Sequence, residues 1–418
     1  MSRLFGTLLV SLLAAFTADG RAGSPGSNGA PRGGRASHSA PPPVWAELPF
    51  PVAGCSVERL VPATRLFDWK PCEGAKACAE AVWNRELVGP DAEIGRRTMV
   101  DDDGQTVRIA VRYDSDAASQ AGVVLAREDG SLELGLRVST RGPCNMNIPS
   151  IGHGRFGVLV TRSASPEGSA RKGGLLAPLA DLGALTPFEI SPLPRGSGPD
   201  SAAWGSSRWL WRFAPDELST FSNIDGKNFT AFAKLSDSIR RLGGPTSTGA
   251  SFLFDVVEVA AGGVPEAYIA RSDGVAPAER FISSTSGSWV GVPLFAHSHI
   301  GWQKGIHPHA NEFDSVELWA SPYTEQASRL APYKVGTLAG KGWTSVGAGW
   351  GRYVTLEDPD RDLHRDFLVW DLEKKTSRDI TLPADRYFEA CAGLTRSALW
   401  IVPGLESSVQ RGLMRFSL

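Results

Sequence analysis

The stretches WGRYVTL (350–356), FLVWDL (367–372) and SALWIVP (397–403) are short apolar runs, and similar runs recur along most of the chain. In RDFLVWDLEKKT (365–376) apolar residues occupy alternate positions before a charged turn, a pattern typical of a half-buried antiparallel strand. Repetition of such units at a regular distance indicates stacked supersecondary units. The chain is therefore predicted to be a repeat protein made of β-strands.

The distances between these runs indicate the kind of repeat. Expected inner strands lie at 107–113, 155–160, 208–213, 251–257, 290–296, 352–356 and 398–402. Their midpoints are roughly 40 to 60 residues apart, close to the about 40–50 residues of a propeller blade. Second strands are expected at 131–138, 266–274, 315–323, 365–376 and 412–418. The turns DDDG (101–104), EDG (128–130) and SDG (272–274) supply Asp-Gly pairs that suit tight hairpins.

Composition agrees with an all-β fold, since 46 Gly, 29 Pro and 13 Trp in 418 residues provide turn formers and large packing rings. We expect a β-propeller over 49–418, most simply with seven blades, with six or eight as alternatives. Two packed β-sandwiches are the other architecture that the pattern fits. The terminal strand GLMRFSL (412–418) is expected to share a blade with strands near 60–88 and so close the ring. The stretch 229–244 fits either a helix or a strand followed by a loop.

The N-terminus predicts the compartment. Arg3 precedes an apolar run over 4–18 and small residues near position 20, the pattern of a signal peptide covering 1–22. The run is shorter than the roughly 20 residues that span a bilayer, so no stable membrane anchor is expected. Residues 23–48 are rich in Gly, Pro and Ser and are expected to form a flexible linker. The mature protein is expected to be secreted or periplasmic.

Five cysteines are present, namely Cys55, Cys72, Cys78, Cys144 and Cys391. In an oxidising compartment an odd number leaves at least one unpaired within the chain. A local Cys72–Cys78 bridge is sterically reasonable, and a Cys55–Cys72 bridge or long-range bridges to Cys144 or Cys391 remain open.

Four of the seven histidines lie within thirteen residues, as the pairs His297/His299 and His307/His309. On a strand an H-x-H pair places both rings on one face, where they can bind a metal ion. Glu312 and Asp314 follow and could complete a Zn or Cu shell. A solvated polar loop explains the same residues, and no cofactor is required by the sequence. The carboxylates at 358–362 resemble a Ca²⁺ loop but lack its Gly and Glu positions, so a hairpin connection is favoured.

Large aromatic residues are the candidates for ligand binding. Rings exposed at the rim of a propeller can stack on a sugar or a peptide, whereas buried rings serve only packing. The candidates are Trp204, Trp209, Trp211, Trp302, Trp343 and Trp350.

Catalytic signatures are absent from the sequence, which has no G-x-S-x-G, H-E-x-x-H or P-loop motif. The S-x-x-K match at 169–172 lacks its companion motifs. A net charge of -2 without a long basic block in the folded part excludes an electrostatic footprint for nucleic acid. A monomer is expected.

The units ending in FLVWDL (367–372) resemble blades of β-propellers of the general WD-repeat or TolB-like kind. The segment from Trp69-Lys70-Pro71-Cys72 to Cys78 is similar to the start of uncharacterised secreted bacterial propeller-like proteins. The resemblance covers about 50–418 and implies a propeller, and it transfers no catalytic residue.

Two functions fit these observations. The first is a secreted non-enzymatic binding or scaffold module that uses one propeller face for a protein or carbohydrate ligand. The alternative is a metal-dependent or glycan-processing enzyme built on the histidines at 297–309. The first is favoured because no nucleophile, base and orienting group are brought together by any motif.

Overall fold

The computed structural model describes the chain in twelve segments, all within the unit that runs from Pro42 to Leu418. They are residues 43–61, 64–95, 98–163, 171–190, 199–213, 217–222, 228–234, 238–259, 263–309, 312–357, 364–405 and 412–418. The expected signal peptide, most of the expected linker and the carboxylates at 358–362 lie outside them. Within these segments, no helix has the length and apolar character needed to cross a membrane.

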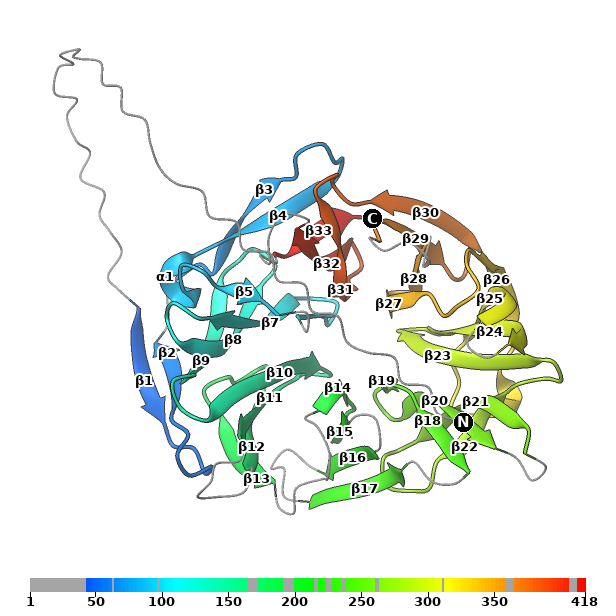
Figure 1. Ribbon diagram of the computed structural model, residues 1–418, viewed down its shortest axis with the longest axis horizontal. Helices are drawn as coiled ribbons and strands as arrows, with labels where there is room; N and C mark the ends of the chain where they lie inside the picture. Colours follow the sequence, from blue (N-terminus) through cyan, green and yellow to red (C-terminus); the bar gives the residue numbers. More distant parts are fainter. Residues whose placement is uncertain are drawn as a thin grey trace, which may run out of the picture. The chain divides into compact units, whose positions relative to one another are not determined.

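The described strands form seven antiparallel sheets, numbered here in their order around the ring of Figure 1. Sheet 1 contains β1 (Val44–Leu48), β2 (Val57–Val61), β5 (Glu93–Ile94), β6 (Met99–Asp102), β7 (Val107–Ser115), β8 (Gln120–Arg127) and β9 (Leu132–Ser139). Sheet 2 contains β10 (Cys144–Gly152), β11 (Arg155–Arg162), β12 (Arg171–Pro178) and β13 (Thr186–Ile190). Sheet 3 contains β14 (Pro199–Trp204), β15 (Arg208–Phe213), β16 (Glu217–Ser222) and β17 (Asn228–Lys234).

The remaining sheets continue along the chain. Sheet 4 contains β18 (Ile239–Leu242), β19 (Thr246–Ser247), β20 (Phe252–Val259), β21 (Pro265–Ser272) and β22 (Glu279–Ser283). Sheet 5 contains β23 (Ser288–Ala296), β24 (His299–His309), β25 (Glu312–Pro322) and β26 (Tyr333–Leu338). Sheet 6 contains β27 (Ser345–Gly349), β28 (Arg352–Leu356), β29 (Asp366–Asp371) and β30 (Thr376–Thr381). Sheet 7 contains β3 (Phe67–Pro71), β4 (Cys78–Trp83), β31 (Arg386–Leu394), β32 (Ala398–Leu405) and β33 (Met414–Ser417).

This arrangement confirms the all-β propeller and corrects the expected blade count. Five sheets, numbers 2 to 6, are blades in which consecutive strands pair with one another. Sheets 1 and 7 are composite, because strands from 44–102 are divided between them. Seven equivalent blades, or the alternatives of six or eight, therefore do not describe the chain: five regular blades are joined by two composite sheets.

The ring closes through the two ends of the folded chain, as the sequence predicted. In sheet 7, β33 pairs with β4 in the register Met414↔Glu80 and Phe416↔Cys78. Arg386 Nη2 and Glu80 Oε1, both largely buried, are 2.9 Å apart beside this pair. Strands from opposite ends of the sequence thus hold one sheet together.

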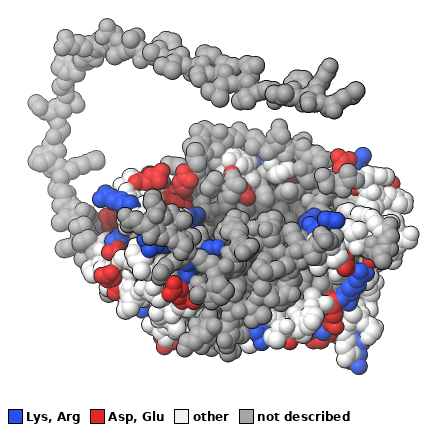
Figure 2. Space-filling model, turned by 60° about the horizontal axis from the view of Figure 1, so that its bottom comes forward, with Lys and Arg blue, Asp and Glu red and all other residues white. Residues whose placement is uncertain are grey.

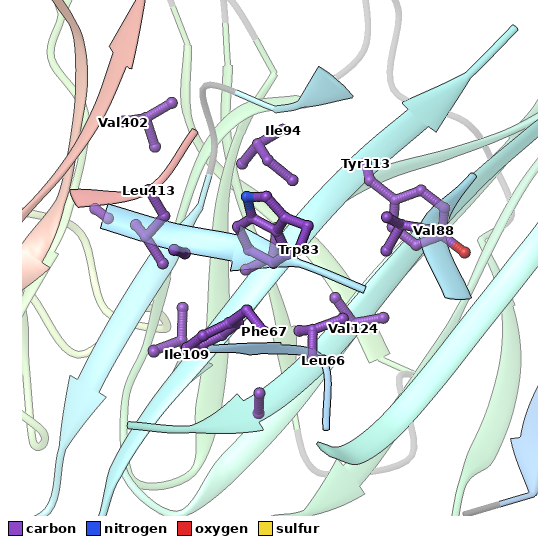
Figure 3. Packing of buried hydrophobic residues seen from close by; sticks show 14 of the residues in the cluster. Leu66, Phe67, Trp83, Val88, Ile94, Ile109, Tyr113, Val124, Val402 and Leu413 are labelled. Carbon is purple, nitrogen blue, oxygen red and sulfur yellow. The ribbon is translucent and has the colours of Figure 1, made fainter. Parts of the chain in front are cut away.

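Apolar side chains fill the spaces between neighbouring sheets. Figure 3 shows one such cluster, in which Trp83 and Leu413 of sheet 7 pack with Ile109 and Val124 of sheet 1. Separate clusters join sheets 1 and 2, 3 and 4, 4 and 5, 5 and 6, and 6 and 7. Contact between sheets 2 and 3 includes a hydrogen bond from Trp204 Nε1 to Ser150 O of 3.1 Å. Packing between blades therefore runs around the whole ring.

The predicted inner strands are real strands, but most of them occupy the second position in their sheets. The runs at 107–113, 155–160, 208–213, 251–257, 352–356 and 398–402 belong to β7, β11, β15, β20, β28 and β32. Only the run at 290–296, in β23, is innermost. A second strand is covered by neighbouring sheets on both faces and is the most apolar, as in the pattern iBBBBBii of β11. In six of the seven sheets, the sequence pattern therefore identified the second strand.

Two disulfides resolve the cysteine alternatives. Cys72 and Cys78 form the local bridge, and Cys55 and Cys144 form a long-range bridge between sheet 1 and sheet 2. Cys391 is the remaining free cysteine, so the expectation of one unpaired residue is confirmed.

Two local expectations also have a clear outcome. Residues 44–48 form β1 at the edge of sheet 1, so the folded part includes the end of the segment expected to be linker. The stretch 229–244 contains β17 and β18 in its described part, in agreement with the strand alternative. The described residues include a single short α-helix, α1 (Arg85–Val88), and a 3₁₀ turn, η1 (Ala327–Arg329).

Candidate functional site

A cavity of about 450 Å³ lies where the innermost strands of all seven sheets meet. β6, β10, β14, β23, β27 and β31 each contribute to it, and sheet 4 contributes β19 with the residue before it. Its lining includes three carboxylates, two imidazoles and one indole, from Asp101, Asp102, Asp103, His153, His297 and Trp204. No lysine or arginine is among the described lining residues. The centre of the ring is therefore an acidic cavity.

Two of the three carboxylates are neutralised by neighbouring arginines. Asp102 is buried, and its Oδ1 lies 3.3 Å from Arg396 Nη2. The backbone N–H of Arg396 also donates to Asp102 Oδ2, at 3.0 Å. Asp103 Oδ2 lies 3.1 Å from Arg108 Nη1. Both charges are thereby balanced next to the cavity.

Asp101 differs from its two neighbours. It is half-buried, and no described side chain lies within ion-pair or hydrogen-bond distance of its carboxylate. Burial, with a smaller contribution from the negative charge of Asp103, raises the pKa of Asp101 to about 6. Among the described residues, Arg108 is the cation that acts on this carboxylate, and its charge offsets only part of the rise in the pKa.

Two histidines lie at the mouth of the cavity, each in a hairpin turn that follows an innermost strand. His153 lies between β10 and β11 with φ of 49°, and His297 lies between β23 and β24 with φ of 61°. Positive φ is uncommon for residues other than glycine, although histidine tolerates it better than most. Both rings keep an exposed surface, while partial burial lowers the pKa of each. Both are therefore neutral at pH 7.

Trp350 lies next to His297 in the equivalent turn of sheet 6, between β27 and β28, with φ of 53°. Its ring packs on His297 with a centroid distance of 4.2 Å, and the Arg396 guanidinium carbon lies 5.6 Å from it. Among the described residues, its buried Nε1–H has no hydrogen-bond acceptor. A bulky residue at positive φ with an unsatisfied donor is the kind of local strain that functional sites retain.

The four clustered histidines do not converge. His297 lies at the cavity mouth, and His299 Nδ1 is 2.9 Å from Ser298 Oγ at the start of β24. His307 and His309 lie at the other end of β24, where Nδ1 of His307 and Nε2 of His309 are 3.0 and 3.1 Å from the Asp314 carboxylate. Within the described segments, no group of three or more His, Cys, Asp or Glu is arranged to hold a metal ion. The predicted single metal cluster is therefore divided into two separate places.

Most of the candidate tryptophans are packed in the core. Trp209 and Trp211 are fully buried, and Trp204 stacks on Trp209 with a centroid distance of 4.6 Å. Trp302 is buried, and Trp343 packs on Phe313 at 4.5 Å. Of the six candidates, Trp204 is the one that lines the central cavity, although its ring is buried. Trp343 and Trp350 are partly exposed, and Trp350 packs on His297, which lines the cavity.

The sequence analysis did not identify Asp101, Asp102 and His153. The motif DDDG was interpreted as a turn, and Gly104 with φ of 87° confirms that turn. Asp103 forms it by accepting hydrogen bonds from the backbone of Gln105 and Thr106, and Asp102 accepts one from the backbone of Gly104. Asp101 is the aspartate of this motif that the turn does not need.

Comparison with known proteins gives a likeness of fold. No protein-family model and no curated protein matches the chain. The β-propeller domain of the Trilobed protease from Pyrococcus furiosus matches 77% of this chain and 93% of its own length, at 10% identity and a TM-score of 0.48. A structure from a study of two prolyl endopeptidases matches 86% of this chain and 54% of its own length, at 11% identity and a TM-score of 0.47. Pyrococcus horikoshii acylaminoacyl peptidase matches 80% of this chain and 53% of its own length, at 12% identity and a TM-score of 0.47.

These neighbours are peptidases or a domain of one, unlike the non-enzymatic binding or scaffold module that the sequence predicted. The chain spans about half the length of the acylaminoacyl peptidase and of the prolyl endopeptidase structure. At these identities the likeness concerns the fold alone.

Proposed function

We propose that this chain is a peptidase-associated propeller whose central cavity receives the amino terminus of a peptide. The observation that carries the proposal is Asp101, a charged and half-buried carboxylate with no ion-pair partner among the described residues, in a cavity whose described lining lacks lysine and arginine. An ammonium group placed there would supply the missing partner. The peptidases among the similar propellers name peptides as the substrate class to test first.

The size and the neutral histidines of the cavity support a short peptide end. A volume of about 450 Å³ is within the range of pockets that enclose small ligands, about 300–1,000 Å³. Because the pKa of His153 and of His297 is lowered, neither ring opposes a cation at pH 7. Their ring nitrogens can accept a hydrogen bond from a peptide N–H.

Two disulfides within a propeller are typical of an oxidising compartment, so we also propose a secreted or periplasmic location.

Calorimetry with Gly-Gly-Gly and its N-acetylated form at pH 7.5 tests the proposal. Free triglycine is expected to bind, and acetylation should lower its affinity at least tenfold because the ammonium charge is lost. Asp101→Asn should lower the affinity for free triglycine to the same degree. Asp116→Asn, in an exposed turn of the same sheet, should leave this affinity unchanged. Equal affinity for the two peptides would contradict the proposal, as would an unchanged affinity in the Asp101 variant.

A further inference from the structure

A second and larger cavity, a groove of about 810 Å³, lies between the outer strand of sheet 6 and the loop closed by the Cys72–Cys78 disulfide. One wall is the run of consecutive residues 378–385, which begins in β30. The opposite wall is the loop 73–77, with Phe416 and Ser417 of β33 beside it. This groove is separate from the central cavity, since the two share no lining residue.

The wall formed by β30 is the edge of a strand. β30 is last in the order β27-β28-β29-β30 and pairs only with β29. Four consecutive residues, 378–381, line the groove, although side chains along a strand point alternately to opposite faces. Residues whose side chains point to opposite faces of a sheet can line the same groove only when the edge of their strand faces that groove. An exposed strand edge is a template for pairing with an extended chain.

The floor and the opposite wall favour an ordered site. Ile380, Leu382 and Phe416 are buried below the groove and give it an apolar floor. The disulfide and a hydrogen bond from Ser417 N to Ala77 O of 2.8 Å fix the opposite loop. A fixed wall opposite a strand edge reduces the entropy lost when a peptide binds.

Charge identifies the kind of peptide. The groove is lined by three basic and three acidic residues, and Glu73, Lys76, Arg378 and Asp379 among them are exposed, where salt screens their effect. Asp385 is paired with Arg386, at 2.8 Å. Arg365 also acts on Asp385 by its charge, but its own Nε is buried and has no hydrogen-bond acceptor among the described residues. A buried guanidinium N–H without a partner favours a carboxylate.

We propose that this groove binds an extended segment of another protein, which adds a strand to β30 and places an acidic side chain against Arg365. The backbone pairing supplies affinity that depends little on sequence, and the guanidinium of Arg365, with its unpartnered Nε, selects an acidic residue over a basic one. Figure 2 shows acidic and basic side chains interspersed on the described surface that it displays, where charge is not gathered into one large patch. Selection therefore depends on a local contact instead of a long-range field.

The test uses fluorescence anisotropy with a labelled heptapeptide, Val-Glu-Val-Glu-Val-Glu-Val, blocked at both ends so that it carries no amine for the central cavity. We expect saturable binding that is at least tenfold weaker for the version with lysine in place of glutamate. Methylation of alternate backbone nitrogens should abolish binding, because methylated amides cannot pair with β30. Retained binding of the methylated peptide would overturn strand addition.

Matched variants separate the groove from the rest of the surface. Ala384→Trp fills the exposed side of the groove, and Arg365→Met removes the buried donor. Each variant should lower the affinity for the peptide at least tenfold. Ala327→Trp and Arg329→Met, both on the exposed turn η1, are the controls and should have no effect. Circular dichroism confirms that each variant is folded. Absence of saturable binding up to millimolar peptide would overturn the proposal. Peptide binding that the groove variants leave unchanged would also overturn it. So would self-association of the protein that Ala384→Trp abolishes, because the groove would then bind a second copy of this chain.

Discussion

Asp101 is half-buried and has no ion-pair partner among the described residues, and an arrangement of this kind costs stability when the carboxylate is ionised. Its pKa in the folded protein is raised from 3.8 to about 6, so the folded state binds a proton more readily than the unfolded state. The free energy of unfolding therefore falls as the pH rises from about 4 to about 6, and it stays lower above that range. A functional group that destabilises its own fold fits a ligand-binding role.

Asp101→Asn should for this reason stabilise the empty protein. At pH 7.5 we expect an increase in the free energy of unfolding of about 1–3 kcal/mol, and little difference from the wild type at pH 4, where Asp101 is largely protonated. Urea denaturation at both pH values measures this difference. Asp116→Asn serves as the control, and an Asp101 variant less stable than the wild type at pH 7.5 would contradict this account of the carboxylate.

Sequence reasoning has a specific weakness at the scale of single residues. The histidines at 297–309 and the aspartates at 101–103 are both close in sequence, yet their functions depend on where the strands end. β24 is eleven residues long and carries His299 and His309 to opposite ends. Asp101 and His297 are far apart in the chain and meet only because both border the ring centre. The clustering of the histidines in the sequence predicted a single site, whereas the fold places them at opposite ends of β24.

At the scale of elements, the hydrophobic pattern predicted strands well and their positions in each sheet less well. β11, β15 and β20 were identified because both of their faces are buried. The innermost strands have more glycine and polar residues, as in β27 (SVGAG), because they border a cavity and pack closely. An innermost strand therefore has the weaker sequence signal, although it carries the candidate site.

The two disulfides allow a quantitative prediction at the same scale. Cys55–Cys144 spans 89 residues and Cys72–Cys78 spans 6, so the first restricts the unfolded chain more. Chain entropy gives a contribution of about 4–5 kcal/mol for the long loop and about 2 kcal/mol for the short one. All four cysteines are similarly buried, which makes the double alanine variants comparable. Urea denaturation should show the Cys55/Cys144 variant to be the less stable by about 2 kcal/mol, and equal losses would count against the loop-length explanation.

At the scale of the whole molecule, the sequence predicted that the strand GLMRFSL (412–418) shares a blade with strands near 60–88 and so closes the ring. The pairing of β33 with β4 confirms that closure. The division of the N-terminal strands between sheets 1 and 7 was not predictable, since it depends on which sheet edges are left open once five regular blades have formed. Closure of the ring is also what brings Asp102, from the N-terminal part, next to Arg396 from the C-terminal part.

The central cavity is the place where the whole ring produces a single chemical environment, and a crystal structure of the protein soaked with triglycine tests its role most directly. We predict that the tripeptide occupies the cavity with its ammonium nitrogen about 3 Å from a carboxylate oxygen of Asp101. Triglycine bound elsewhere, or bound in the cavity with its amine turned away from Asp101, would contradict the account.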